Sequence, residues 1–248
     1  MTVEDFAALH DSADPLILFN VWDAGSARAV AETGARAIAT GSLSMAGAQG
    51  VDDGENLPFD GLLQTVQQIA GAIDLPLTVD FETGYAGDVS TLARNAGALR
   101  ESGAVGCNIE DRLIDQPGLR DVDEQCERIE TVAAEGLFVN ARTDIFLGPL
   151  MAGDDPNRPE LLEAAIERAH RYRDAGAGCF FVPGLGDPAL LGELCERTEI
   201  PVNAMRLDGM IANGRLGRLG VSRISYGPAP WREAMEFVRD AAVRAMAS

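Results

Sequence analysis

Short apolar runs recur along the whole chain, and each is followed by a longer segment with apolar positions at helical spacing. The runs cover residues 16–23, 35–43, 75–82, 104–111, 137–144, 178–184, 201–205 and 221–227. Continuous apolar runs of this length indicate strands that are buried on both faces, as in parallel sheets. The hydrophobic pattern therefore predicts eight parallel strands separated by helices.

The segments between these runs carry helix boundaries at the expected places. Several begin with Asp or have Pro in the first turn. A weak internal repeat places Gly just before a strand in "ETGARAIAT", "ESGAVGCNI", "DAGAGCFFV" and "RLGVSRISY". Eight such units in 248 residues predict one domain, residues 1–248, with the (β/α)8 TIM barrel fold. An open doubly wound parallel sheet is the structural alternative.

Polar residues at the ends of the predicted strands are the candidates for an active site, because barrel enzymes place their sites there. The third run ends in "TVDFETGY", where period-2 alternation points Asp80 and Glu82 to the same side. The whole set is Asn20, Asp23, Ser42, Ser44, Asp80, Glu82, Asn108, Glu110, Asp111, Asn140, Arg142, Asp144, Asn203 and Ser225. The mouth of the barrel is therefore expected to be strongly acidic.

Carboxylates that converge in this way repel one another unless a cation neutralises them. All 20 basic residues are Arg, which excludes Schiff-base lysine chemistry, and two His exclude a multi-histidine metal site. Oxygen ligands favour Mg2+, with Mn2+ as the alternative ion. We expect Asp80, Glu82 and Glu110 to hold this ion; Asp111 and Asp144 could instead cap helices or pair with loop arginines.

Arg142 lies at the end of the apolar run "LFVNARTD", so its charge must be matched by an acid or by an anionic ligand. A guanidinium binds a carboxylate through two parallel hydrogen bonds. The sequence thus predicts a small-molecule carboxylate substrate bound at Arg142. A structural ion pair with Glu110 or Asp144 is the alternative.

The composition of the chain disfavours some classes of partner and indicates a location in the cell. A formal net charge of -19 disfavours nucleic acid and anionic membranes as partners. No apolar run approaches the roughly 20 residues of a membrane span, and residues 1–10 lack the features of a signal peptide, so a cytoplasmic location is expected. The four cysteines lack CxxC spacing, which favours buried free thiols over redox or zinc roles.

Several motifs together resemble one known family. "NVWDAGSARAVAETGARAIATGS", "TVDFETGYAG", "GCNIED", "NARTD" and "RISYGP" occur in this order at the predicted strand positions. They are similar to the isocitrate lyase and phosphoenolpyruvate mutase superfamily over nearly the whole chain. The resemblance implies an Mg2+-dependent barrel that makes or breaks C–C or C–P bonds next to a 2-oxo acid. It also implies a homodimer or homotetramer in which the last helix, within "WREAMEFVRDAAVRAM", is exchanged between subunits.

The resemblance assigns roles to individual residues. Asp80 matches the acid closest to the metal, while Glu82 stands where many members have a second Asp, and several of the acids are expected to act through water. Arg142 matches the substrate-binding arginine, and Ser42 and Leu43, with Asn203, match substrate-binding positions. The remaining catalytic candidates are Glu110 of the "IED" motif, Asp53 of the loop after the second strand, and Tyr85, whose alternative role is packing.

The loop after the fourth strand departs from the specialised members of this superfamily. Members that cleave isocitrate or methylisocitrate carry a "KKCGH"-like stretch there, whereas this chain reads "EDRLIDQPGLRDVDEQ" without Cys, His or Lys. The Asn and Ser of the phosphonomutase branch are missing as well. We therefore predict an Mg2+-dependent lyase that acts on a small 2-oxo or 2-hydroxy carboxylate through an enolate. A phosphonate-handling mutase or hydrolase, and a barrel that binds Mg2+ and a 2-oxo acid without turnover, are the alternatives.

Overall fold

The computed structural model of the protein describes residues 2–114 and 116–247. The strands in this part of the chain are β1 (Leu16–Leu18), β2 (Ile38–Ala39), β3 (Leu77–Asp80), β4 (Gly106–Glu110), β5 (Phe138–Arg142), β6 (Cys179–Val182), β7 (Val202–Met205) and β8 (Val221–Ser225). Each strand lies inside a range predicted from the apolar runs and is shorter than that range. The ends of the predicted ranges instead form the loops that carry the polar residues.

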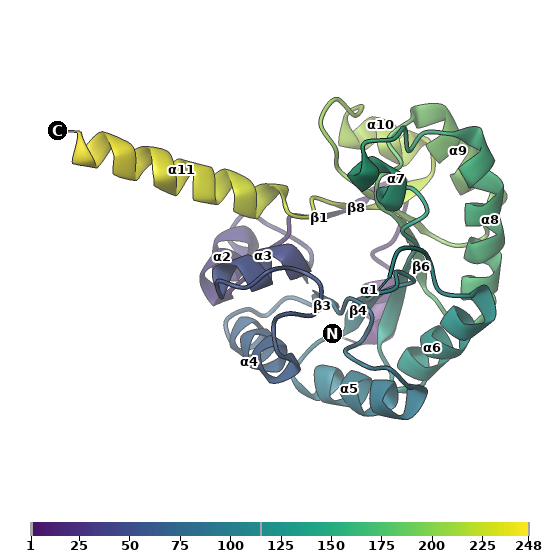
Figure 1. Ribbon diagram of the computed structural model, residues 1–248, viewed down its shortest axis with the longest axis horizontal. Coiled ribbons are helices and arrows are strands. Elements are labelled where there is room, and N and C mark those ends of the chain that lie inside the picture. The colour runs from purple at the N-terminus through teal and green to yellow at the C-terminus, as the bar shows by residue number, and fades with distance from the viewer. Residues whose placement is uncertain (1, 115, 248) are drawn as a thin grey trace.

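The strands form one parallel sheet in the order β1-β8-β7-β6-β5-β4-β3-β2. The two edge strands meet through a parallel bridge between Val21 and Thr40, where the Val21 amide donates to the carbonyl of Ala39 at 2.8 Å. This contact closes the sheet into a barrel (Figure 1). The predicted (β/α)8 fold is confirmed, and the open-sheet alternative is wrong.

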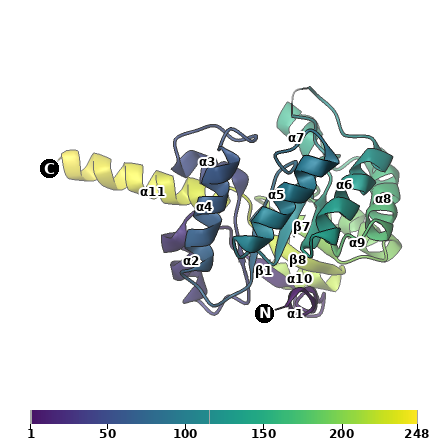
Figure 2. The same ribbon diagram turned by 90° about the horizontal axis from the view of Figure 1, so that it is seen from below.

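Apart from α11, the helices of the described chain surround the barrel or lie at its ends (Figures 1 and 2). The helices are α1 (Val3–Ala7), α2 (Ala24–Ala31), α3 (Ser42–Ala48), α4 (Phe59–Ala70), α5 (Val89–Glu101), α6 (Val122–Ala134), α7 (Leu147–Ala152), α8 (Pro159–Asp174), α9 (Pro188–Arg197), α10 (Asn213–Arg218) and α11 (Ala229–Met246). Asp88 caps α5 through the amide of Thr91, and the glycine that follows α5, Gly103, has a φ of 107°. These are the start and stop signals that the sequence indicated.

The second unit differs from its prediction. The sequence pattern suggests a strand over residues 35–43, but β2 ends at Ala39, and Ser42 and Leu43 form the first turn of α3. Gly41, which still has extended backbone, is the residue that precedes this helix. As a result, Ser42 and Leu43 present backbone amides at the barrel mouth instead of strand side chains.

Side chains that point into the barrel change character along its length. Near the amino-terminal end Leu16, Leu18, Phe138 and Cys179 form an apolar cluster with Phe6 of α1, the helix that lies at this end of the barrel (Figure 2). Higher up, the inward positions are polar and buried, and they include Asn108, Asn140, Asn203 and Arg223. The apolar base stabilises the barrel, whereas the polar upper part leads to the site.

Helix α11 projects away from the barrel that precedes it (Figures 1 and 2). Of its side chains, Phe237 and Val243 are 69% and 62% exposed. On the barrel, Ile17 of β1 and the adjacent Phe19 are also exposed, at 38% and 42%. Apolar surface is thus left uncovered both on this helix and on the barrel.

None of the helices in the described residues is long and apolar enough to cross a membrane. The four cysteines are free, and three of them are buried. The expectation of buried thiols is met for Cys107, Cys126 and Cys179, while Cys195 is partly exposed.

His10 makes the apolar base of the barrel sensitive to acid. Its ring stacks on Phe138 with the centroids 4.5 Å apart, and burial, followed by the charge of Arg223, lowers the pKa of His10 to about 3 from 6.5. As the pH falls, the imidazole of His10 therefore takes up a proton in the unfolded chain before it does so in the folded protein. The stability that His10 contributes is complete above pH 6.5 and is lost as the pH falls toward about 3.

We expect the free energy of unfolding of the wild type, relative to His10→Phe, to fall by about 1.4 kcal/mol per pH unit below the ordinary histidine pKa. Urea titrations of both proteins across this pH range measure the difference. His170→Gln is the matched control and should keep the wild-type slope. Parallel curves for the wild type and His10→Phe would show that His10 does not titrate on unfolding.

Candidate active site

The acidic residues and the arginine named from the sequence meet at the carboxyl ends of neighbouring strands. Asp80 ends β3, Glu110 ends β4 and Arg142 ends β5. Glu110 and Arg142 are direct partners in the parallel register, so their side chains point to the same side of the sheet. The barrel thus brings together residues that are separated by about thirty positions in the sequence.

Arg142 is clamped by two carboxylates. Its Nη1 lies 2.7 Å from Oε2 of Glu110, while Nε and Nη2 donate to the two oxygens of Asp144 at 2.7 and 3.0 Å. Burial alone would lower the pKa of Arg142, but Asp144 and Glu110 outweigh it and hold this pKa well above its ordinary value. The ion pairs that the sequence left as an alternative are therefore present, with both candidate acids.

The clamp leaves part of the guanidinium available. A guanidinium has five N–H donors: one on Nε and two on each Nη nitrogen. Asp144 accepts hydrogen bonds from Nε and Nη2, and Glu110 forms an ion pair with Nη1. Among the contacts of the described residues, one N–H on Nη1 and one on Nη2 remain, which matches the two oxygens of a carboxylate.

Glu82 occupies a strained and buried position. Its φ of 50° is in the left-handed region, and its side chain accepts from the Tyr85 hydroxyl at 3.0 Å and from the Glu55 amide at 2.8 Å. Burial, followed by the charges of Asp80, Asp53 and Glu110, raises the pKa of Glu82 to about 8. Glu82 is thus a carboxyl group that a nearby cation would convert to its ionised form.

Asp80 has the free acceptor that a metal ion needs. Its Oδ2 accepts from the Ser42 amide at 3.1 Å, whereas its Oδ1 is buried without a hydrogen-bond partner in residues 2–114 and 116–247. A buried carboxylate oxygen without a partner is costly, and a cation would satisfy it. The donor set, all oxygen, fits Mg2+.

The described residues contain no group of three or more carboxylate, histidine or cysteine side chains at direct metal-binding spacing. Glu110 instead pairs with Arg142 and with Arg112, whose Nε lies 2.9 Å from Oε1 of Glu110. Burial raises the pKa of Glu110, and Arg142 opposes the rise. The residues that would hold an Mg2+ ion here are Asp80, Glu82 and Glu110, which offer only oxygen donors.

The other predicted site residues fall into different surroundings. Asp53 is exposed but close enough to raise the pKa of Glu82. Tyr85 donates its hydroxyl to Glu82, and burial raises its pKa, so the phenol stays protonated and suits a donor better than a base. Leu43 is half-buried, and Asn203 is buried with both amide atoms bonded to Ser225. Each of these two amide atoms keeps one further hydrogen-bonding position.

Asp111 and Asp144 have structural partners, as the alternative in the sequence analysis suggested. Asp111 is fully buried and accepts from the Tyr172 hydroxyl at 2.9 Å, from Arg168 Nη1 at 3.1 Å and from the Asp144 amide at 3.0 Å. It therefore ties α8 to the loop after β5. Because Asp144 in turn holds Arg142, this network fixes the position of the arginine.

Two residues of the site, Glu55 and Arg223, were not predicted from the sequence. Glu55 accepts from the amides of Thr83 and Tyr85 at 3.0 Å each, and nothing in its local sequence indicated this role. Arg112 pairs with Glu110, and only the structure shows which acid it meets. Arg223 is buried in the barrel, donates to Asn108 at 3.3 Å, and has its pKa lowered to about 10 by burial. Period-2 alternation from Ser225 could have placed Arg223 inside.

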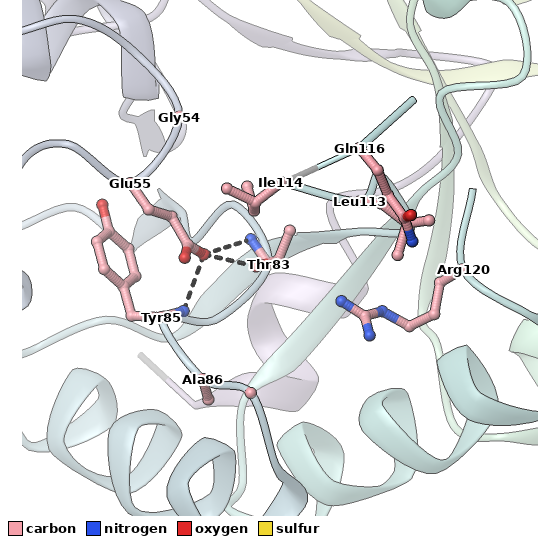
Figure 3. A pocket seen from close by; sticks show the side chains of 10 residues that line it. Gly54, Glu55, Thr83, Tyr85, Ala86, Leu113, Ile114, Gln116 and Arg120 are labelled. Carbon is pink, nitrogen blue, oxygen red and sulfur yellow. Dashed lines mark hydrogen bonds between the residues drawn. The ribbon is translucent and has the colours of Figure 1, made fainter. Parts of the chain in front are cut away.

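A cavity of about 620 Å³ opens beside Glu82, between the loops that follow β2, β3 and β4. Glu55, Thr83 and Tyr85 line one side, and Arg120 extends toward it from the opposite side (Figure 3). Its lining is mainly polar. We refer to it as the polar cavity.

Comparison with known proteins places the chain in a family. The family model for phosphoenolpyruvate phosphomutase matches residues 6–246. A structure from Burkholderia cenocepacia, provisionally assigned as a phosphonomutase, superposes with a TM-score of 0.92 at 40% identity and covers 98% of each chain. The 2-methylisocitrate lyase of Escherichia coli is 29% identical over 80% of this chain and 68% of its own length. An oxaloacetate decarboxylase of Pseudomonas paraeruginosa is 27% identical, with 95% and 82% covered.

Fold and sequence agree on the class of protein: this is an enzyme of the superfamily of lyases, mutases and hydrolases that contains isocitrate lyase and phosphoenolpyruvate mutase. Within that superfamily, the chain belongs to the phosphoenolpyruvate phosphomutase family. The resemblance seen in the sequence motifs is confirmed.

The raised pKa of Glu82 predicts that Mg2+ binding depends on pH. Mg2+ must displace the proton that Glu82 holds below about pH 8, so its affinity should fall as the pH decreases through this value. We expect a loss of up to about tenfold per pH unit for each proton displaced. Isothermal titration calorimetry with Mg2+ on both sides of this pH gives the measurement.

Glu82→Gln removes the titrating group, so its weaker Mg2+ affinity should vary less with pH. Glu167→Gln, an exposed change on α8, is the control and should follow the wild type. An affinity for Mg2+ that is the same on both sides of the pKa of Glu82 would contradict this account of the site.

Proposed function

We propose that the protein is an Mg2+-dependent lyase that cleaves a C–C bond next to the carbonyl of a small, oxaloacetate-like 2-oxo or 2-hydroxy carboxylate. The observation that carries this proposal is the state of Arg142. Two carboxylates hold it rigidly and keep it charged, yet two of its N–H donors remain for a ligand. Asp80, with its unpartnered Oδ1, is close enough to influence the pKa of Arg142.

Each residue has a role that follows from its contacts. Arg142 binds the carboxylate of the substrate and places the carbonyl toward Asp80. Glu110 and Asp144 orient Arg142, and Tyr85 and the Glu55 amide orient Glu82. When bound at Asp80, Mg2+ supplies positive charge that stabilises a developing enolate. Positioning and charge of this kind are the largest contributions to many enzymatic rates.

The loop after β4 limits the chemistry. Residues 110–125 contain no Cys, His or Lys, so carboxyl groups are the acids and bases that this loop offers, and Glu110, whose pKa is raised, is already paired with Arg142. Loss of CO2 from an oxaloacetate-like acid forms an enolate without a base. Decarboxylation is therefore the reaction that needs the fewest proton-transfer groups from these residues.

A phosphonate-handling mutase or hydrolase is the second candidate. It is favoured by the 40% identity to the protein that is provisionally assigned as a phosphonomutase. Two arginines of the loop after β4 could bind a phosphoryl group: Arg112, which pairs with Glu110, and Arg120, which pairs with Glu124 but lines the polar cavity and has a buried Nε without a partner in the described residues. A barrel that binds Mg2+ and a 2-oxo acid without turnover is the third candidate.

We expect Mg2+-dependent turnover of oxaloacetate or a substituted malate, and a fall in kcat/KM of at least about 100-fold in Asp80→Ala and in Arg142→Gln. A spectrophotometric assay of the 2-oxo acid, run with and without EDTA, provides the measurement. Glu167→Gln should keep wild-type activity. Full activity and full Mg2+ affinity in Asp80→Ala would disprove the site.

The same assay separates the candidates. Preferential turnover of phosphonopyruvate or phosphoenolpyruvate would favour the second candidate. If nothing is turned over, but oxalate or pyruvate raises the melting temperature only in the presence of Mg2+, the third candidate is favoured.

We also propose that α11 packs on a second copy of this chain. The exposed apolar residues of α11 and the uncovered Ile17 and Phe19 are complementary surfaces of the same molecule. Because α11 points away from its own barrel, the barrel of a partner is the surface that it can cover (Figure 1). Reciprocal exchange between two copies would bury both surfaces.

Phe237→Glu combined with Val243→Glu should shift the protein to a monomer, because two buried carboxylates in an apolar interface are strongly unfavourable. Light scattering after size-exclusion chromatography measures the mass. Met151→Glu changes a side chain on α7 that is 78% exposed, and serves as the control. A wild-type protein that is monomeric at micromolar concentration would refute the exchange.

A further inference from the structure

A second cavity lies on the other side of the loop that follows β4, between this loop and helices α7 and α8. Its volume is about 480 Å³, which is within the range of small-molecule sites. Leu113 and Leu119 line it from the loop, Ile145 and Pro149 from the chain after β5, and Leu161 from α8. We refer to it as the apolar cavity.

The apolar cavity adjoins the active site at two residues. Arg112 and Asp144 both line it. Arg112 donates to Glu110, and Asp144 holds Nε of Arg142 at 2.7 Å. A ligand whose carboxylate is bound by Arg142 therefore has this cavity next to it.

The chemistry of the walls selects an apolar group. The two charged residues at the inner end are already paired, Arg112 with Glu110 and Asp144 with Arg142, so neither requires a polar partner from a ligand. The remaining walls are mostly aliphatic, and a charged or hydroxylated group placed among them would lose its hydration without replacement. Burial of an alkyl chain there is favourable instead.

The loop that forms one wall is held in place by its own backbone. Arg112 and Leu119 form an antiparallel bridge, and the Leu113 amide donates to the Gly118 carbonyl at 3.2 Å. At the base of the loop, the Arg120 amide donates to the Asp111 carbonyl at 2.7 Å. These contacts fix the backbone that carries Leu113 and Leu119, so the wall exists before a ligand arrives.

We propose that the apolar cavity is the subsite for an alkyl chain on C3 of the substrate. The substrate class is then a 2-oxo or 2-hydroxy carboxylate whose apolar chain is longer than the methyl group of pyruvate. This proposal rests on the proposed function, because it requires the substrate carboxylate to lie at Arg142. It names the part of the substrate that the acids and arginine of the site leave undefined.

Binding of a homologous series tests the subsite without turnover. With Mg2+ present, calorimetry should show tightening by about threefold to fourfold for each methylene added from pyruvate through 2-oxobutyrate and 2-oxopentanoate to 2-oxohexanoate. Oxaloacetate, which carries a carboxylate on C3, should gain nothing from the cavity.

Two variants test whether the alkyl chain of the ligand lies in the apolar cavity. Leu161→Asp puts a charge into the apolar cavity but lies in the first turn of α8, where an acid is favourable for the helix, so the fold should be retained. It should weaken the binding of 2-oxohexanoate at least about tenfold and change the affinity for pyruvate by no more than about twofold. Ile114→Asp, in the same loop but lining the polar cavity, is the matched control and should leave the series unchanged.

The outcomes distinguish this proposal from the function on which it rests. If pyruvate binds with Mg2+ but chain length has no effect, the subsite is refuted and the proposed function stands. If Ile114→Asp, and not Leu161→Asp, removes the effect, the chain lies in the polar cavity and the proposal is wrong. If no 2-oxo acid binds with Mg2+, the proposed function fails and the subsite with it.

Discussion

The pairing of Arg142 with Glu110 and Asp144 is the interaction on which the rest of the site depends. A buried guanidinium is strongly unfavourable unless its charge is matched, and loss of one partner leaves the other charge uncompensated. The parallel register of β4 and β5 makes Glu110 and Arg142 direct neighbours, so the barrel itself enforces the pair. The N–H donors that remain free on Arg142 are therefore few, and their directions are fixed.

The surrounding residues hold this pair from outside the barrel. Asp111 accepts hydrogen bonds from Tyr172 and Arg168 of α8 and from the amide of Asp144 in the loop after β5. On the opposite side, Glu55 binds the amides of Thr83 and Tyr85, which supports the left-handed backbone of Glu82 and Tyr85. Non-glycine residues in that region cost of order 1–3 kcal/mol each, and such strain is typical of functional sites. Two separate networks thus support the arginine and the acids.

The site and its neighbouring cavities suit different parts of a substrate. Charged groups at Asp80 and Arg142 suit the carboxylate and carbonyl that all substrates of the proposed class share. The loop after β4 separates a polar cavity from an apolar one, and its residues face both: Ile114 lines the first, and Leu119 lines the second. Changes in this single loop can alter substrate choice without disturbing the charged centre, as is common for barrel enzymes.

The sequence by itself determined the barrel and the acidic mouth, because both follow from local patterns. Apolar runs placed all eight strands, and their ends pointed to Asp80, Glu110 and Arg142. Only the tertiary structure decided which charges meet. Arg142 pairs with both candidate acids, Arg223 lies in the core without a carboxylate among its hydrogen-bond partners in the described residues, and α11 leaves its own barrel. These outcomes depend on distances between segments that are remote in the chain, and no local periodicity encodes such distances.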